Sequence, residues 1–175
     1  MKKLLTLAAF GAVFSATACA APITPFGFYV GYFRGNSFSD RLSNSVHLSG
    51  FELGVQQSLV SLPLLGAVDI GASVCFGGSL KDSGSVNGNL YRIYAQYKSP
   101  SGVGPIYAVG GFGYYLARGS SFNNQSGFGT EIGIGYPLKL GGGIPGLPGA
   151  AIEARYRLGQ RAATKGWAIG VTVQF

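Results

Sequence analysis

Polar and apolar residues alternate along the end of the chain. Every second residue from Trp167 to Phe175 is apolar, and the residues between them are small or polar. A period of two is typical of a β-strand with one apolar face. The length of the run also matches the roughly 9–11 residues that a tilted strand needs to cross a bilayer. The pattern therefore predicts a membrane-crossing strand at the C-terminus.

Seven further segments alternate in the same way, and clusters of Gly, Ser, Asn and Pro separate them. The predicted strands cover residues 26–35, 46–57, 65–76, 89–98, 106–118, 127–138, 150–158 and 166–175. The predicted connections are four loops near 36–45, 77–88, 119–126 and 159–165 at one end, and three turns near 58–64, 99–105 and 139–149 at the other. An even strand number suits an up-and-down barrel. The predicted fold class is all-β, an eight-stranded antiparallel up-and-down transmembrane β-barrel.

The residue types on the two strand faces decide which face points outward. In the segment 65–76, one parity carries Val68, Ile70 and Phe76, while the other carries small residues and Asp69. A soluble barrel of lipocalin type would place a solvated, charge-rich face outside, and this polar face is too poor in charge. The apolar face is therefore assigned to lipid.

Aromatic residues on the lipid parity gather near both ends of the predicted strands. The outer group comprises Tyr32, Tyr91, Tyr114, Phe128, Tyr156 and Trp167, and the inner group comprises Phe28, Tyr97, Tyr136 and Phe175. Lipid interfaces favour such aromatic girdles. Chance placement in a chain with 13% aromatic residues is the alternative.

The first residues have the layout of a secretory signal peptide. Lys2 and Lys3 precede an apolar stretch, and small residues follow at every second position up to Ala20. We expect residues 1–20 to be a cleaved signal peptide and residues 21–175 to form the outer-membrane barrel. A lipoprotein signal that ends at Cys19 is the alternative, although Ala stands where Leu is usual. After ordinary cleavage Cys75 would remain alone, which excludes an intrachain disulfide.

Composition narrows the class of protein. The chain has 11% charged residues, 47% hydrophobic residues and 30 glycines, yet no apolar stretch beyond residue 14 reaches the roughly 20 residues of a transmembrane helix. Without helices, only a closed barrel satisfies its backbone in lipid. The net charge falls from +7 to +5 when Lys2 and Lys3 are removed, and the remaining lysines and arginines are scattered singly, so no nucleic acid partner is expected. Outer-membrane lipids and lipopolysaccharide are the expected partners.

Seven ionisable residues fall on the inward parity. They are Glu52, Asp69, Arg92, Glu131, Glu153, Arg155 and Arg157. An eight-stranded lumen is only wide enough for its own side chains, and an unpaired buried charge is severely penalised. We therefore expect these residues to pair into a plug, with Arg155 in salt-bridge range of Glu131. A gated pore or a proton path through the same groups is the functional alternative.

One pair of residues raises the question of catalysis. His47, the only histidine, shares a predicted strand face with Ser49, which slightly resembles the His-x-Ser element of the outer-membrane lipid A deacylases. The nearest acid, Glu52, has the opposite parity, and a nucleophilic serine needs a base that a third group orients. We therefore predict no catalytic site. One histidine and one remaining cysteine cannot build a usual zinc site, so no metal and no cofactor are expected.

From the signal peptide to Phe175 the chain resembles the small eight-stranded outer-membrane barrels, the family that includes the OmpA transmembrane domain and OmpX. The alternating strands, the Gly-x-Gly-aromatic stretches and the terminal Phe carry the resemblance. It implies a place in the cell outer membrane, recognition of Phe175 by the barrel assembly machinery, and a structural or surface-interaction role. A lipid A-modifying enzyme and a conduit for small hydrophobic molecules are the alternatives. The sequence does not identify an extracellular loop partner.

Overall fold

The structure is a computed structural model that describes residues 26–39, 45–62, 64–77, 87–100, 105–120, 122–138 and 149–175. The predicted signal peptide, Cys19 and nearly all of the predicted turn 139–149 lie outside these residues. No helix in the described part of the chain is long and apolar enough to cross a membrane.

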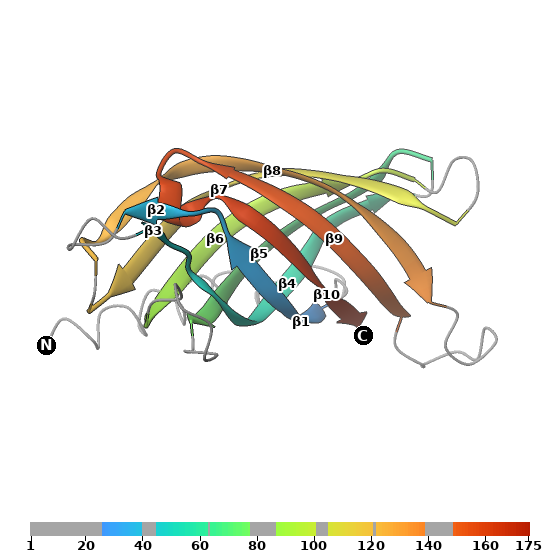
Figure 1. The fold of residues 1–175 in the computed structure, drawn as a ribbon. Coiled ribbons are helices and arrows are strands. Elements are labelled where there is room, and N and C mark those ends of the chain that lie inside the picture. Colours follow the sequence, from blue (N-terminus) through green and yellow to red (C-terminus); the bar gives the residue numbers. More distant parts are fainter. Residues whose placement is uncertain are drawn as a thin grey trace, which may run out of the picture.

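Eight long strands form a closed barrel (Figure 1). They are β1 (Phe26–Gly35), β4 (Ser49–Leu62), β5 (Gly66–Gly77), β6 (Gly88–Lys98), β7 (Tyr107–Gly119), β8 (Gln125–Leu138), β9 (Gly149–Gly159) and β10 (Gly166–Gln174). Each strand pairs antiparallel with its neighbour, and β1 pairs with both β4 and β10, which closes the sheet. The predicted fold class is confirmed.

The two ends of the barrel differ, and we name them the termini end and the loop end. At the termini end the Phe175 N–H donates to the Phe26 carbonyl at 2.8 Å, and the Phe26 N–H donates to the Phe175 carbonyl at 3.2 Å. At the loop end a small sheet of β2 (Phe38–Ser39) and β3 (Ser45–Val46) follows β1, and a short 3-10 helix, η1 (Ala162–Thr164), joins β9 to β10. Figure 1 shows β2 and β3 at the left of the barrel and the C-terminus at its right.

Side chains along each strand alternate between the exposed outer wall and the buried lumen. The outer wall is apolar, and Phe51, Phe112, Ile132 and Trp167 are each more than half exposed. Most of the charged side chains on the intervening positions are buried. Packing therefore separates an apolar outer wall from a partly polar interior.

The strand boundaries differ from the prediction mainly around β4. This strand continues to Leu62, so the predicted turn at 58–64 is wrong over its first five positions. A bulge between Ser58 and Val60 interrupts the register, and Leu59 and Val60 are both exposed. Since a bulge inserts an extra residue, alternation stops there and the segment no longer has the pattern of a strand.

The predicted strand 46–57 is also wrong at its start. Val46 belongs to β3, β4 begins at Ser49, and the predicted loop 36–45 contains β2. The other strand ends lie within two residues of the predicted ones.

Candidate functional site in the barrel lumen

Glu131 on β8 is the centre of an ion-pair network that crosses the lumen. Its carboxylate pairs with the Arg92 guanidinium from β6, and it lies 3.3 Å from Nη1 of Arg155 and 3.7 Å from Nε of Arg157, both from β9. These four side chains are essentially inaccessible to solvent. Three cations thus surround one carboxylate, which requires further acids nearby.

Glu52 on β4 supplies one of these acids. Nη2 of Arg157 donates to both of its oxygens, at 2.7 and 2.8 Å, and Nη2 of Arg92 lies 3.7 Å away. The Ser73 hydroxyl donates to Glu52 Oε1 at 2.6 Å and accepts from Nε of Arg92 at 3.1 Å. The two arginines therefore bridge Glu52 to Glu131.

A second group of charges lies toward the termini end. Nζ of Lys98 is 3.0 Å from Oδ2 of Asp69 and 3.1 Å from Oε1 of Glu153. The Tyr107 hydroxyl donates to Glu153 at 2.6 Å, and Arg155 also pairs with Glu153. Arg155 consequently joins the two groups, because it contacts both Glu131 and Glu153.

Lys98 was not among the predicted lumen residues. The available signal was its parity, since it follows Arg92 and Gln96 at even positions of β6. Its place at the end of the strand obscured that signal. With Lys98 included, the described lumen holds four carboxylates and four cationic side chains, so its formal charge is balanced.

Aromatic rings also contact the buried guanidinium groups. The Arg92 guanidinium lies 3.8 Å from the ring centre of Tyr94, that of Arg155 lies 5.3 Å from Tyr29, and that of Arg157 lies 5.0 Å from Phe33. A cation over an aromatic face is stabilised electrostatically, more strongly when water is excluded. These contacts and the ion pairs together offset the cost of desolvating the charges.

Glycines on the facing strands make room for the large lumen side chains. A Cβ on Gly135 would lie 2.1 Å from the ring of Tyr107, and one on Gly71 would lie 2.5 Å from that of Tyr94. Real side chains do not approach so closely, so glycine at these two positions leaves room for each tyrosine ring.

The loop end of the lumen is closed by a buried apolar cluster, which we call the apolar cap. Its members are Phe33, Phe38, Val46, Leu48, Cys75, Leu90, Tyr115, Ala117, Phe122, Ala163 and Ala168. The rings of Phe38 and Phe122 meet edge to face, with centroids 5.3 Å apart. Several members come from the connections rather than from the long strands, so the loops themselves fold into the barrel mouth.

The structure does not assemble a catalytic group around His47 and Ser49. His47 is half-buried, and Ser49 is 5% exposed although it has the same parity as the exposed Phe51. Ser49 is the first residue of β4, opposite Arg34 on β1 and next to Leu48 of the apolar cap, which explains its burial. Within the described residues, no hydrogen bond joins His47 to Ser49, and Glu52 is occupied by Arg157. No group of three or more His, Cys, Asp or Glu side chains in the same residues is placed to hold a metal ion.

Exposed aromatic side chains lie near both ends of the outer wall. Toward the loop end the Tyr114 and Phe128 rings are 5.3 Å apart, and the Tyr156 and Trp167 rings are 4.7 Å apart. Tyr32 lies in the same zone, with its ring 6.1 Å from that of Phe51. The predicted girdle residues Tyr91, Tyr97 and Tyr136 are likewise half-buried or exposed, with Tyr97 and Tyr136 toward the termini end.

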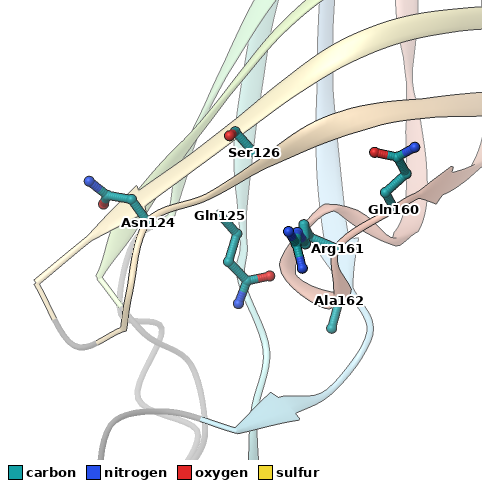
Figure 2. A pocket seen from close by; sticks show the side chains of 6 residues that line it. All are labelled: Asn124, Gln125, Ser126, Gln160, Arg161 and Ala162. Atoms are coloured by element: carbon teal, nitrogen blue, oxygen red, sulfur yellow. The ribbon is translucent and has the colours of Figure 1, made fainter.

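A polar hollow of about 490 Å³ opens at the loop end, between the β7–β8 and β9–η1 connections (Figure 2). It is lined by Asn124, Gln125, Ser126, Gln160, Arg161 and Ala162. The hollow lies outside the ion-pair network, and sequence reasoning did not identify it.

No protein-family model and no curated protein matches the chain. Among solved structures, Neisserial surface protein A (NspA) aligns over 86% of this chain and 97% of its own, with a TM-score of 0.50 and 17% identity. The chain has the fold of the small eight-stranded outer-membrane barrels. Two further barrels with this fold are similar at lower scores. The N-terminal barrel domain of Pseudomonas aeruginosa OprF gives a TM-score of 0.47 at 16% identity, covering 86% and 97% of the two chains. Ail, the attachment invasion locus protein of Yersinia pestis, gives 0.46 at 16% identity, covering 88% and 100%.

Proposed function

We propose that the protein is a non-enzymatic outer-membrane barrel with a closed lumen, whose loop end faces the outside of the cell as an interaction surface. The observation that carries the proposal is the filled interior. Balanced charges occupy the lumen from Lys98 to Arg157, and the apolar cap occupies its mouth. Because the lumen is filled, other molecules would bind to the outer wall or to the loop end.

The outer wall supports a location in lipid. Large apolar side chains such as Phe51, Ile93 and Ile169 are more than half exposed, and a soluble protein rarely leaves so continuous an apolar surface uncovered. Exposed aromatic residues near both ends of this wall are suited to the two membrane interfaces. Lipopolysaccharide and the other outer-membrane lipids are the proposed partners of the wall.

The structure offers no observation that favours the lipid hydrolase or the hydrophobic conduit. In the described residues His47 and Ser49 have no carboxylate partner, and all eight neighbouring strand pairs are hydrogen-bonded around the barrel.

Fractionation and gel mobility test the proposal. We expect the protein in the outer-membrane fraction, with a band that shifts on heating because the closed barrel resists detergent. A cysteine introduced at Asn123, in the β7–β8 connection, should react with an impermeant maleimide on intact cells. Recovery from the soluble periplasm, or labelling only after lysis, would contradict the proposal.

We also propose that Phe175 is the signal recognised by the barrel assembly machinery. Its side chain is 66% exposed, whereas its backbone pairs with Phe26. Phe175→Ala retains both backbone hydrogen bonds and removes only the ring, so we expect the variant to accumulate unfolded in the periplasm while refolding normally into vesicles in vitro. Equal assembly of the variant and the wild type in cells would assign Phe175 a role in barrel closure alone.

A further inference from the structure

We propose that the polar hollow at the loop end binds a phosphate group of lipid A, the acylated anchor of lipopolysaccharide. This inference rests on the proposed location in the outer membrane and names one partner of the barrel. The hollow brings Arg161 together with Gln125 and Gln160, and Figure 2 shows the Arg161 side chain between the two amides.

Two glutamine amides line the hollow. Oε1 of Gln125 accepts the N–H of Ala163 at 3.1 Å, and Oε1 of Gln160 accepts the N–H of Phe128 at 3.2 Å. Because the backbone holds each amide oxygen, the amide NH₂ groups are left to interact with a ligand. The lining residues that the structure describes include no carboxylate. A hollow rich in donors favours an anion.

Arg161 adds the positive charge. Its side chain is exposed and has no ion pair within the described residues, in contrast to the buried and paired Arg155 and Arg157. A guanidinium presents its donors as a planar fork that matches two oxygens of one phosphate. Arg161 is therefore available for a ligand, whereas the lumen arginines are not.

Local packing fixes the walls of the hollow while leaving the Arg161 side chain free. The N–H and the hydroxyl of Thr164 both donate to the Arg161 carbonyl, at 3.0 and 2.7 Å. A Cβ on Gly127 would lie 2.8 Å from Oε1 of Gln160, so glycine there lets the Gln160 side chain lie against β8. The two glutamine amides are held in place before a ligand arrives, which reduces the entropy cost of binding for this part of the hollow.

The surface next to the hollow indicates that the anion belongs to a lipid. Phe128, 63% exposed, lies two residues along β8 from Ser126, and Leu158, 45% exposed, lies two residues along β9 from Gln160. Two residues of a strand span about 7 Å. The apolar outer wall therefore lies within about 7 Å of the polar hollow. A lipid A molecule needs this arrangement, because its acyl chains would contact the wall while its phosphate enters the hollow.

Binding to the folded protein in detergent micelles tests the inference, with native mass spectrometry as the readout. The probes are bisphosphorylated lipid A, dephosphorylated lipid A and inorganic phosphate. We expect the wild type to prefer the bisphosphorylated form, and Arg161→Ala to weaken its binding by about tenfold or more, since hydrogen bonds to charged groups are the stronger ones. Arg34→Ala, which removes an exposed loop-end arginine outside the hollow, should bind like the wild type.

Three outcomes would overturn the inference. Arg161→Ala could bind lipid A as the wild type does, or Arg34→Ala could lose as much affinity, which would indicate a general effect of basic residues. Inorganic phosphate could bind as tightly as lipid A, which would assign the hollow to a free anion. If the protein is found in the outer membrane and shows any of these results, only the lipid A inference is contradicted. Recovery as a soluble periplasmic protein would contradict the proposed function itself.

Discussion

The middle and the termini end of the lumen are filled by charges, whereas its loop end is filled by apolar side chains. The charged part comes from the long strands, with Glu52, Glu131 and Arg155 held by inward parity and by each other. The apolar cap instead draws Phe38, Phe122 and Ala163 from the connections. Mutations in the two parts should therefore change the stability of the barrel by different amounts. Removing one charge leaves the buried network with an uncompensated charge, whereas removing one ring leaves a cavity that the loops can partly fill.

The largest effect is expected for Arg155→Ala. This change leaves Glu131 and Glu153 each short of a cationic partner in a buried site, which typically costs about 3–5 kcal/mol. Urea unfolding in lipid vesicles measures the loss, and the matched control is Arg161→Ala, whose exposed side chain has no ion pair within the described residues and should change stability by less than about 0.5 kcal/mol. Equal midpoints for the two variants would mean that the network does not stabilise the barrel.

A smaller loss is expected for Phe122→Ala in the apolar cap. The ring is 1% exposed and packs on Phe38, and deletion of a buried aromatic ring costs about 3 kcal/mol or somewhat more in a rigid core. Because Phe122 lies in a connection that can relax, we expect a value at or below that figure. Asn123→Ala, an exposed neighbour in the same connection, is the control in the same unfolding experiment. A loss larger than that of Arg155→Ala would reverse the comparison.

A third substitution tests whether η1 packs against the loop end of the barrel. A Cβ on Gly159 would lie 1.9 Å from the Thr164 hydroxyl, so Gly159→Ala should displace η1 and cost about 1–3 kcal/mol. Gly149, at the other end of the same strand, has nothing within 4 Å of an added Cβ, and Gly149→Ala should be neutral or slightly stabilising. The two variants should therefore differ in thermal midpoint, and matching midpoints would show that η1 is not packed into the mouth.

The sequence predicts the charged part of this comparison better than the apolar part. The chain has few charged residues, and the period-two alternation of each strand predicts which strand face each of them occupies. This reasoning placed the seven predicted ionisable residues on the inward face, where the structure buries them. Lys98 was missed because it ends its strand, and the extension of β4 was missed because the bulge after Ser58 breaks the alternation.

The members of the apolar cap that come from the connections, and most of the polar hollow, have no periodic signature. Phe38, Phe122 and Ala163 lie in connections, where no spacing rule states which side chains turn inward. The side-chain amide oxygens of Gln125 and Gln160 each accept a backbone N–H from another segment, and these pairings exist only in the folded backbone. Local pattern therefore predicted the wall of the barrel, and tertiary packing decided what closes its loop end.

Ion conductance across a planar bilayer tests the central claim that the lumen is closed along its length. The wild-type barrel should show no stable current steps, because both the charged network and the apolar cap lie in the path. Combining Phe33→Ala with Phe122→Ala should open only the cap and still give no steady conductance, since the network beneath remains. Steady open-channel current through the wild-type protein would contradict the account.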